Sequence, residues 1–222
     1  MTTRRVKTAP ETAHSGEPSP PQDNRETQLL LIARQLFASK GFDRTSLRDI
    51  ADEAKITKAA LYYYFPNKDA LYERVVLESL ETLVRVVSAA VEQHQSPTDR
   101  VLAYMRASAD FLDERRDQWL AGSNAFRQGP QNEQRLKAVK LRDTYEKLLR
   151  QCIMDGIVTG EFRPVDASMA GRFLLSTLNH LSRWHKPGGR LTAHEVMEQF
   201  VNMALFGLVA TPAANPRSPA KT

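Results

Sequence analysis

The sequence has little cysteine and no long apolar run, and both absences restrict what the protein can be. Cys152 is the single cysteine among 222 residues, which excludes a disulfide framework and any zinc site built on several cysteines. No apolar stretch reaches the roughly 18 residues that a membrane-spanning helix needs. The opening stretch, MTTRRVKTAP, lacks the apolar region of a secretory signal peptide. We therefore expect a cytoplasmic protein with no membrane partner.

Motifs that carry common enzymatic chemistry are also missing. The chain has no Gly-x-Ser-x-Gly elbow for a nucleophilic serine and no glycine-rich loop that would hold a phosphate. His180, His185 and His194 do not have the spacing of metal ligands. Cys152 lies on an apolar helix face, where an inert thiol is expected rather than a nucleophile. We therefore expect that the protein is not an enzyme and that it holds neither a metal ion nor a cofactor.

Helical periodicity runs through most of the chain between two proline-rich ends. Apolar residues recur three and four positions apart, and no stretch alternates with the period of two that indicates a strand, which predicts an all-α fold of about nine helices. We expect residues 1–22 to be a disordered basic arm and residues 211–222 a disordered tail, because neither has enough large apolar side chains to offset the entropy of ordering. Between them we expect two domains, residues 23–68 and residues 69–210.

Capping residues and glycines indicate where several helices begin and end. Asn67 is a good N-cap for the long amphipathic segment that follows it. Residues 131–155 predict another helix, which we expect Gly156 to close. The segment TAHE at residues 192–195 has the form of a capping box for the last helix, which should end near Ala210.

The segment TSLRDIADEAKITKAALYYYFPNK, residues 45–68, is the most informative part of the sequence. It predicts two short helices joined by a turn, because Thr57 is a good N-cap and Pro66 disfavours helical geometry before it. Another helix precedes them and ends at Gly41. Two short helices joined by a turn and stabilised by a third are the physical description of a helix-turn-helix.

The second short helix has an unusual outward side. At roughly 100° per residue, the residues that point away from the other helices are Lys58, Ala59, Tyr62 and Tyr63. Outward tyrosines suit a DNA major groove, because a tyrosine can contact a phosphate through its hydroxyl or a thymine methyl through its ring. Thr57 stands at the helix N-terminus, where such motifs place base contacts. The alternative is that Tyr62 and Tyr63 pack in a protein interface.

Helix N-termini and nearby cations supply candidate phosphate contacts. Unpaired N–H groups and a partial positive charge make a helix N-terminus favourable for anions. One such terminus lies at Thr45 and Ser46, Lys68 adds a full charge at another, and Arg48 projects from the first short helix. The net charge of the whole chain is +5, but acids nearly balance the cations of residues 23–72. We therefore expect a shallow salt dependence of DNA binding, with a slope no steeper than about −8 in log K against log salt.

The stretch GFDRTSLRDIADEAKITKAALYYYFPNKDAL resembles the DNA-binding segment of TetR-type bacterial transcriptional regulators. The likeness lies in Gly-Phe before the first short helix, Ile-Ala within it, Leu-Tyr-x-x-Phe in the second, and a lysine two residues after Pro66. It implies an all-helical homodimer with a DNA-binding head and a larger C-terminal domain for effector binding and dimerisation. Tyr64 departs from the histidine that many members carry. By position, the likeness assigns DNA contacts to Thr57, Lys58, Tyr62, Tyr63 and Lys68, with Thr45, Ser46 and Arg48 in support.

Residues 69–210 are more than a DNA-binding head needs, and a ligand pocket between helices is the usual use of such a domain. Polar side chains that interrupt apolar runs are candidates for its lining, because an unpaired polar group in a core is costly. These are Asn124, Arg127, Asn179 and Arg183. The apolar candidates, for which ordinary core packing is the alternative, are Tyr104, Phe111, Trp119, Phe126, Tyr145, Leu149, Phe173 and Leu174.

The C-terminal part of the chain has a narrower likeness. Its Gly-x-Phe-Arg-Pro turn and the later pattern Arg-Trp-x-x-Pro-Gly-Gly-x-Leu-Thr-x-x-x-Val are similar to a subgroup of these regulators that controls fatty-acid or sterol degradation. Effectors in that subgroup are acyl-CoA thioesters. The likeness implies that Arg127 and Arg183 face the CoA phosphates and that Trp184 packs nearby. The pattern can equally reflect a dimer interface in which the last two helices of each subunit form a four-helix bundle.

The sequence is therefore interpreted as a transcriptional repressor that binds a palindromic operator as a homodimer. A small-molecule effector, an acyl-CoA thioester by the narrower likeness, releases it. One alternative is a DNA-bound protein with a non-transcriptional role, such as division placement. Another is an enzyme acting on the same ligands, which the missing motifs disfavour. The sequence does not distinguish a repressor from an activator.

Overall fold

The computed structural model describes residues 22–123 and 133–206, and these ranges form nine α-helices and no strand. This confirms the all-α prediction. None of the described helices combines the length and apolar character required to span a bilayer. The predicted disordered tail, all of the predicted arm except Gln22, and the expected helix end at Ala210 lie outside the described residues. The helices are α1 (Gln22–Lys40), α2 (Leu47–Glu53), α3 (Lys58–Tyr64), α4 (Lys68–Glu92), α5 (Pro97–Glu114), α6 (Arg116–Ser123), α7 (Glu133–Thr159), α8 (Ala167–Trp184) and α9 (Ala193–Phe206).

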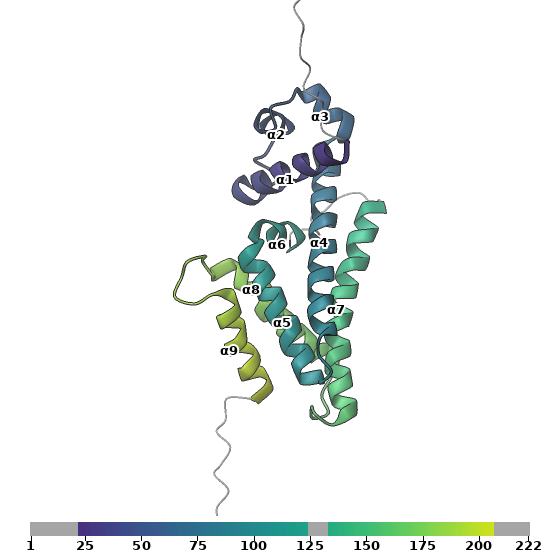
Figure 1. The fold of residues 1–222 in the computed structure, drawn as a ribbon, viewed down its shortest axis with the longest axis vertical. Helices are drawn as coiled ribbons and strands as arrows, with labels where there is room; N and C mark the ends of the chain where they lie inside the picture. The colour runs from purple at the N-terminus through teal and green to yellow at the C-terminus, as the bar shows by residue number, and fades with distance from the viewer. Residues whose placement is uncertain (1–21, 124–132, 207–222) are drawn as a thin grey trace, which may run out of the picture.

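Helices α1, α2 and α3 form a small head at one end of the molecule, and the first turns of α4 complete it (Figure 1). The head has its own apolar core, because each of these helices turns one apolar side inward. The buried core residues of these helices are Leu29, Leu30, Ala33, Phe37, Ile50, Ala51, Ala54, Leu61, Phe65, Leu71 and Val75, and Ala121 of α6 packs into the same cluster.

Local signals set the limits of the head helices, as the sequence predicts. Gly41 follows α1 with a φ of +86°, a conformation that favours glycine. The Ser46 hydroxyl accepts the Asp49 N–H at 3.1 Å, and the Asp49 carboxylate accepts the Ser46 N–H at 2.8 Å, which makes a capping box for α2. The Thr57 hydroxyl accepts the Ala60 N–H at 3.1 Å and caps α3.

The long helix α4 connects the head to the rest of the molecule. Its N-cap is Asn67, whose side-chain oxygen accepts the Ala70 N–H at 2.8 Å. It then runs down the molecule and packs against α5, α6 and α7 (Figure 1). The helix ends at Glu92.

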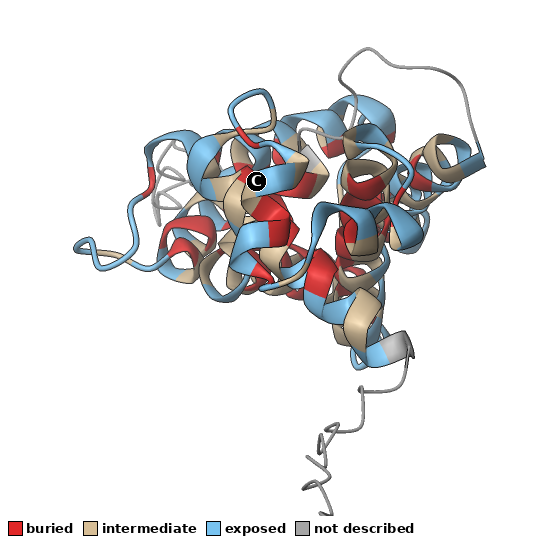
Figure 2. Ribbon diagram, turned by 90° about the horizontal axis from the view of Figure 1, so that it is seen from above, coloured by how far each residue is buried: buried red, intermediate tan, exposed pale blue. Residues whose placement is uncertain are grey.

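The larger domain contains most of α4 together with α5 to α9. Figure 2 shows that buried residues lie where helices face one another, while the outer sides of the helices are exposed. Cys152 is fully buried in this core, and burial raises the pKa of its thiol. A protonated, inaccessible thiol agrees with the inert role expected for it.

One helix limit differs from the prediction. Helix α7 continues through Gly156 to Thr159 and is followed by Gly160, which has a φ of +78°. Gly156 does not end the helix. A glycine is needed there because the ring of Phe162 packs where a Cβ would lie. The Phe162 N–H also donates to the Gly156 carbonyl at 2.9 Å, so the chain folds back over the end of α7.

The last two helices both begin at capping residues, and the last begins as the sequence predicts. The Asp166 carboxylate accepts the Ser168 N–H at 2.8 Å at the start of α8. At the start of α9, the Glu195 carboxylate accepts the Thr192 N–H at 2.8 Å, while the Thr192 hydroxyl accepts the Glu195 N–H at 3.1 Å. These bonds form the predicted capping box.

Candidate DNA-binding face and effector pocket

Helix α3 has the two-sided character that its sequence predicts. On the inner side, Leu61 is fully buried and Tyr64 is half-buried. On the outer side, Tyr63 is 72% exposed and Tyr62 is 45% exposed. The Lys58 ammonium lies 5.5 Å from the centre of the Tyr62 ring, so the cation and the ring share one surface. Thr57 and Ala59 are exposed on the same helix, which completes the predicted outward set.

A groove beside α3 brings together most of the cations predicted to contact DNA. The side chains of Arg48, Lys58 and Lys68 line it, with Tyr62 and Ser46 among their neighbours. Arg48 is well exposed and lies 3.7 Å from Asp52, a loose pair that an incoming phosphate can replace. The full lining is Asp43, Arg44, Thr45, Ser46, Leu47, Arg48, Lys58, Tyr62 and Lys68.

Two of the predicted contacts hold the head together in this structure. Thr45 is buried, and its hydroxyl donates to the Gly41 carbonyl at 2.8 Å. The Lys68 ammonium donates to the carbonyls of Phe42 and Thr45, at 3.0 and 3.1 Å, and lies 4.2 Å from the centre of the Phe42 ring. The geometry does not support a side-chain contact from Thr45 to DNA. Lys68 still contributes its charge to the groove.

Arg44 is a groove residue that the sequence reasoning missed. It is exposed, and its Nε donates to the Lys40 carbonyl at the end of α1. A basic residue just before the cap of α2 was a usable signal, since a cation near a helix N-terminus beside a DNA-reading helix is well placed for a phosphate.

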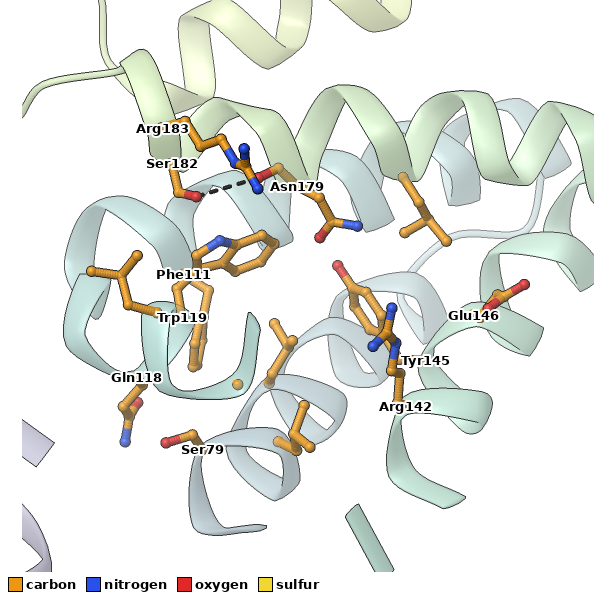
Figure 3. A pocket seen from close by; sticks show the side chains of 15 residues that line it. Ser79, Phe111, Gln118, Trp119, Arg142, Tyr145, Glu146, Asn179, Ser182 and Arg183 are labelled. Carbon is orange, nitrogen blue, oxygen red and sulfur yellow. Dashed lines mark hydrogen bonds between the residues drawn. The ribbon is translucent and has the colours of Figure 1, made fainter. Parts of the chain in front are cut away.

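The larger domain contains a cavity of about 490 Å³ between α4, α5, α6, α7 and α8 (Figure 3). Five residues expected to line an effector pocket meet there: Phe111, Trp119, Tyr145, Asn179 and Arg183. They come from four helices, since Asn179 and Arg183 are both on α8, and Figure 3 shows their side chains around one space. The volume is within the range of about 300–1,000 Å³ that small-molecule sites occupy. The remaining lining residues are Ser79, Leu80, Leu83, Gln118, Leu120, Gly122, Arg142, Glu146, Leu175 and Ser182.

Tyr104 is a core residue rather than a pocket residue. It is fully buried, and its hydroxyl donates to the Tyr145 carbonyl at 2.9 Å. The Tyr145 hydroxyl donates in turn to Ser108 at 2.7 Å. Because that hydroxyl is already bonded, Tyr145 lines the cavity with its apolar ring. Burial raises the pKa of Tyr145 to about 12 and keeps both phenols protonated. Leu149 is likewise a fully buried core residue.

Other predicted effector residues lie elsewhere. Phe173 is 59% exposed and lines, with Leu174, a separate hollow of about 710 Å³ between α8, the end of α9 and the turn before α8. Trp184 is 51% exposed and lies 6.3 Å from the ring of Phe200 on α9. Three further candidates, Asn124, Phe126 and Arg127, lie outside the described residues.

The first turn of α6 connects the cavity to the head. Arg34 of α1 donates from Nε to the Asp117 carboxylate at 2.7 Å, and its Nη1 lies 3.7 Å from the Glu78 carboxylate of α4. On the other side, Arg116 donates to the Ser182 carbonyl of α8 at 2.7 Å. The two residues that follow Asp117 line the cavity. One helical turn therefore contacts the head, the cavity and α8.

Several large apolar side chains are exposed on α8, on α9 and in the turn before α8. They are Val165, Met169, Phe173, Met203 and Phe206, and all but Met203 line one hollow. Exposed apolar side chains that gather in this way are typical of a surface that another protein covers.

Comparisons with known proteins decide the family. Residues 29–75 match the family described as bacterial regulatory proteins, tetR family, and residues 94–208 match the tetracyclin repressor-like C-terminal domain. The chain belongs to the TetR family. The first match covers the helix-turn-helix, and the second covers α5 to α9, so both parts of a TetR regulator are present.

Individual TetR proteins agree with this assignment. The chain is 30% identical over 193 residues to the HTH-type transcriptional repressor KstR2 of Mycolicibacterium smegmatis, covering 86% of this chain and 93% of that one. The structure of the TetR regulator PfmR from Thermus thermophilus matches with a TM-score of 0.76 and 34% identity, over 82% of this chain and all of the other. AibR, solved with isovaleryl coenzyme A and operator DNA, has the same fold, with a TM-score of 0.73 at 24% identity over 81% of this chain and 97% of that one.

Proposed function

We propose that this TetR-family regulator is a transcriptional repressor that binds a palindromic operator as a homodimer and is released by an acyl-CoA thioester. The observation that carries the proposal is the position of α6: its first turn lines the cavity and is bonded through Asp117 to Arg34 in the DNA-binding head. A ligand in the cavity therefore acts on an element that the head itself contacts. The relative KstR2 is named a transcriptional repressor, which favours repression over activation.

The positions of individual side chains in the head, rather than its net charge, support specific DNA binding. Helix α3 presents Lys58, Tyr62 and Tyr63 on a side that no other described helix covers. Arg44 and Arg48 flank it in the adjoining groove and are suited to phosphates on either side of the major groove. Thr57 and Ala59 at the start of α3 leave room for a close approach to base edges.

The cavity supports a ligand that is apolar at one part and anionic at another. Its apolar wall includes Phe111, Trp119 and Leu83, which suit an acyl group. Arg142 and Arg183 also line it, and the guanidinium group is well matched to phosphates. AibR, solved in complex with isovaleryl coenzyme A, shows that a protein of this fold binds an acyl-CoA. A complete acyl-CoA is larger than about 490 Å³, so part of it would lie outside the cavity.

The exposed apolar side of α8 and α9 supports a homodimer. Phe206 is 76% exposed, and a second copy packed on these helices would cover it together with Met169 and Phe173. A dimer of this kind presents two heads, which must fit successive major grooves about 34–36 Å apart. Release then requires that the ligand bind preferentially the form in which this spacing is lost.

The test is fluorescence anisotropy of the purified protein on labelled duplex DNA from upstream of its own gene. We expect nanomolar binding that acyl-CoA thioesters reverse, while free CoA does not. A scrambled duplex is the control for specificity. Tight, specific binding that no thioester changes would contradict the effector assignment and leave the regulator intact. Binding no tighter than to the scrambled duplex would require genome-wide mapping of binding sites before the repressor assignment could stand.

A further inference from the structure

One corner of the cavity holds a buried acceptor oxygen that no described donor satisfies. Gln118 of α6 is only 7% exposed, and its side-chain oxygen has no hydrogen-bond partner among the described residues. Ser79 of α4 lies on the lining as well, and its hydroxyl proton is already donated to the Val75 carbonyl at 2.7 Å. Both side chains therefore present acceptor oxygens to the cavity. Figure 3 draws them close to each other and far from Arg183 in that view.

A buried acceptor without a donor is costly, and proteins rarely keep one that has no use. Apolar side chains also line the cavity, among them Leu80, Leu83 and Phe111. A purely hydrocarbon ligand would leave the Gln118 oxygen without water and without a partner. A ligand with a hydroxyl at its buried end would instead donate to that oxygen.

We propose that Gln118 reads a hydroxyl group on the buried end of the effector, so that the preferred ligands are hydroxylated acyl-CoA thioesters. The inference rests on the proposed function, because it assumes that a thioester occupies this cavity. It adds the chemistry of the acyl group, which the arginines at the other part of the lining do not specify. Gln118 follows Asp117 directly, so the hydroxyl would bond to the same turn of α6 that contacts Arg34.

The test uses matched pairs of thioesters that differ by one hydroxyl group. Hexanoyl-, octanoyl- and decanoyl-CoA are compared with their ω-hydroxy counterparts by isothermal titration of the full-length protein. We expect at least one ω-hydroxy thioester to bind the wild type about ten-fold more tightly than its parent, because one net hydrogen bond to a buried acceptor has about that effect. The chain length at which the preference appears reports how far Gln118 is from the thioester.

Variants of Gln118 separate recognition from a structural role. In Gln118→Leu the preference for the hydroxyl should disappear or reverse, while the parent thioester binds at least as well as before. Gln118→Glu keeps an acceptor of nearly the same size and should keep the preference. Gln151→Leu changes an exposed glutamine of α7 outside this cavity and should behave as wild type. Operator binding by each variant shows that it is folded.

The outcomes distinguish this inference from the function on which it rests. If parent and ω-hydroxy thioesters bind the wild type equally at every length, the inference is wrong while the effector class stands. If Gln118→Leu keeps the full hydroxyl preference, the reading residue is not Gln118 and the inference also fails. If no thioester of either kind binds, the effector class fails and the inference falls with it.

Discussion

The head and the larger domain bury apolar side chains in the same way but keep their functional polar groups in opposite places. In the head, Lys58 and Tyr63 project from an exposed helix side, and the buried polar groups are bonded to the backbone, as Thr45 is. In the larger domain, Gln118 and Arg183 line an internal cavity. A surface site depends on one helix, whereas an enclosed site depends on how several helices pack. The first is therefore more robust to change elsewhere in the molecule than the second.

The largest effect should come from removing side chains of the exposed site. In the double variant Lys58→Ala, Tyr63→Ala we expect operator affinity to fall about a hundred-fold, because each lost contact is worth about 1–3 kcal/mol. Thermal stability should not change, since both side chains are exposed. Anisotropy on operator DNA measures the loss, and Lys186→Ala in the exposed loop after α8 is the matched control. Unchanged affinity would remove α3 as the DNA-reading helix.

The stability of the larger domain should instead be sensitive to packing, as at Gly156 near the end of α7. Gly156→Ala places a methyl group against the ring of Phe162 and should destabilise the protein by about 1–3 kcal/mol. Gly171→Ala is the control, because its Cβ would meet only Ile153 at an ordinary 3.8 Å and alanine favours a helix. Urea unfolding of both variants measures the difference. Equal stabilities would show that Phe162 moves aside freely and that this part of the domain is not tightly packed.

The ion pair between Arg34 of the head and Asp117 of α6 should affect the response to a thioester more than it affects operator affinity. In Arg34→Gln we expect operator affinity to change little, while the factor by which a thioester weakens it shrinks about five-fold, which corresponds to about 1 kcal/mol of coupling. Arg74→Gln is the control, because Arg74 pairs with Glu26 of α1 at 3.5 Å without involving α6. A full thioester response in Arg34→Gln would show that the signal reaches the head along another route, such as α4.

The smallest effect concerns the helix caps, one in each region. Hydrogen bonds from Ser46 lower the pKa of the Asp49 carboxyl, and bonds from Thr192 lower that of Glu195. A lowered pKa means that the folded state holds fewer protons than the unfolded chain, so this stability is present above about pH 4 and is lost as pH falls further. The melting temperature should therefore drop between about pH 5 and pH 3.

Comparison of the two cap variants then shows which region responds to acid. Asp49→Asn and Glu195→Gln should each show a slightly smaller drop than the wild type, because each has lost one group that titrates. The change should be modest, since both carboxylates face solvent. Melting curves at several pH values measure it, and an identical drop in all three proteins would contradict the role of these caps.

Local structure and the exposed site were predictable from sequence to a large extent. Caps such as Ser46, Thr57 and Asn67 act within a few residues of themselves, so their effect is visible in the chain. The outward side of α3 follows from helical periodicity alone. Thr45 shows the limit of this reasoning, because its burial depends on how α1 meets α2.

The enclosed site was predictable only in part, for the same physical reason. Phe111, Trp119 and Arg183 reach the cavity, but Tyr104 and Phe173, which have similar helical contexts, do not. Whether an apolar helix position faces a core, a cavity or an exposed side depends on the rotation of each helix against partners distant in sequence. Gly156 is a similar case, because its role depends on Phe162 folding back over α7.

In this account, thioester binding in the cavity and operator binding by the head are energetically coupled. Titration of one thioester into the free protein and into the operator-bound protein tests this directly, because linkage requires each partner to weaken the other by the same factor. We predict that the thioester binds the free protein more tightly than the DNA complex, by the factor with which it weakens operator affinity. Equal thioester affinities for the two forms would contradict the account.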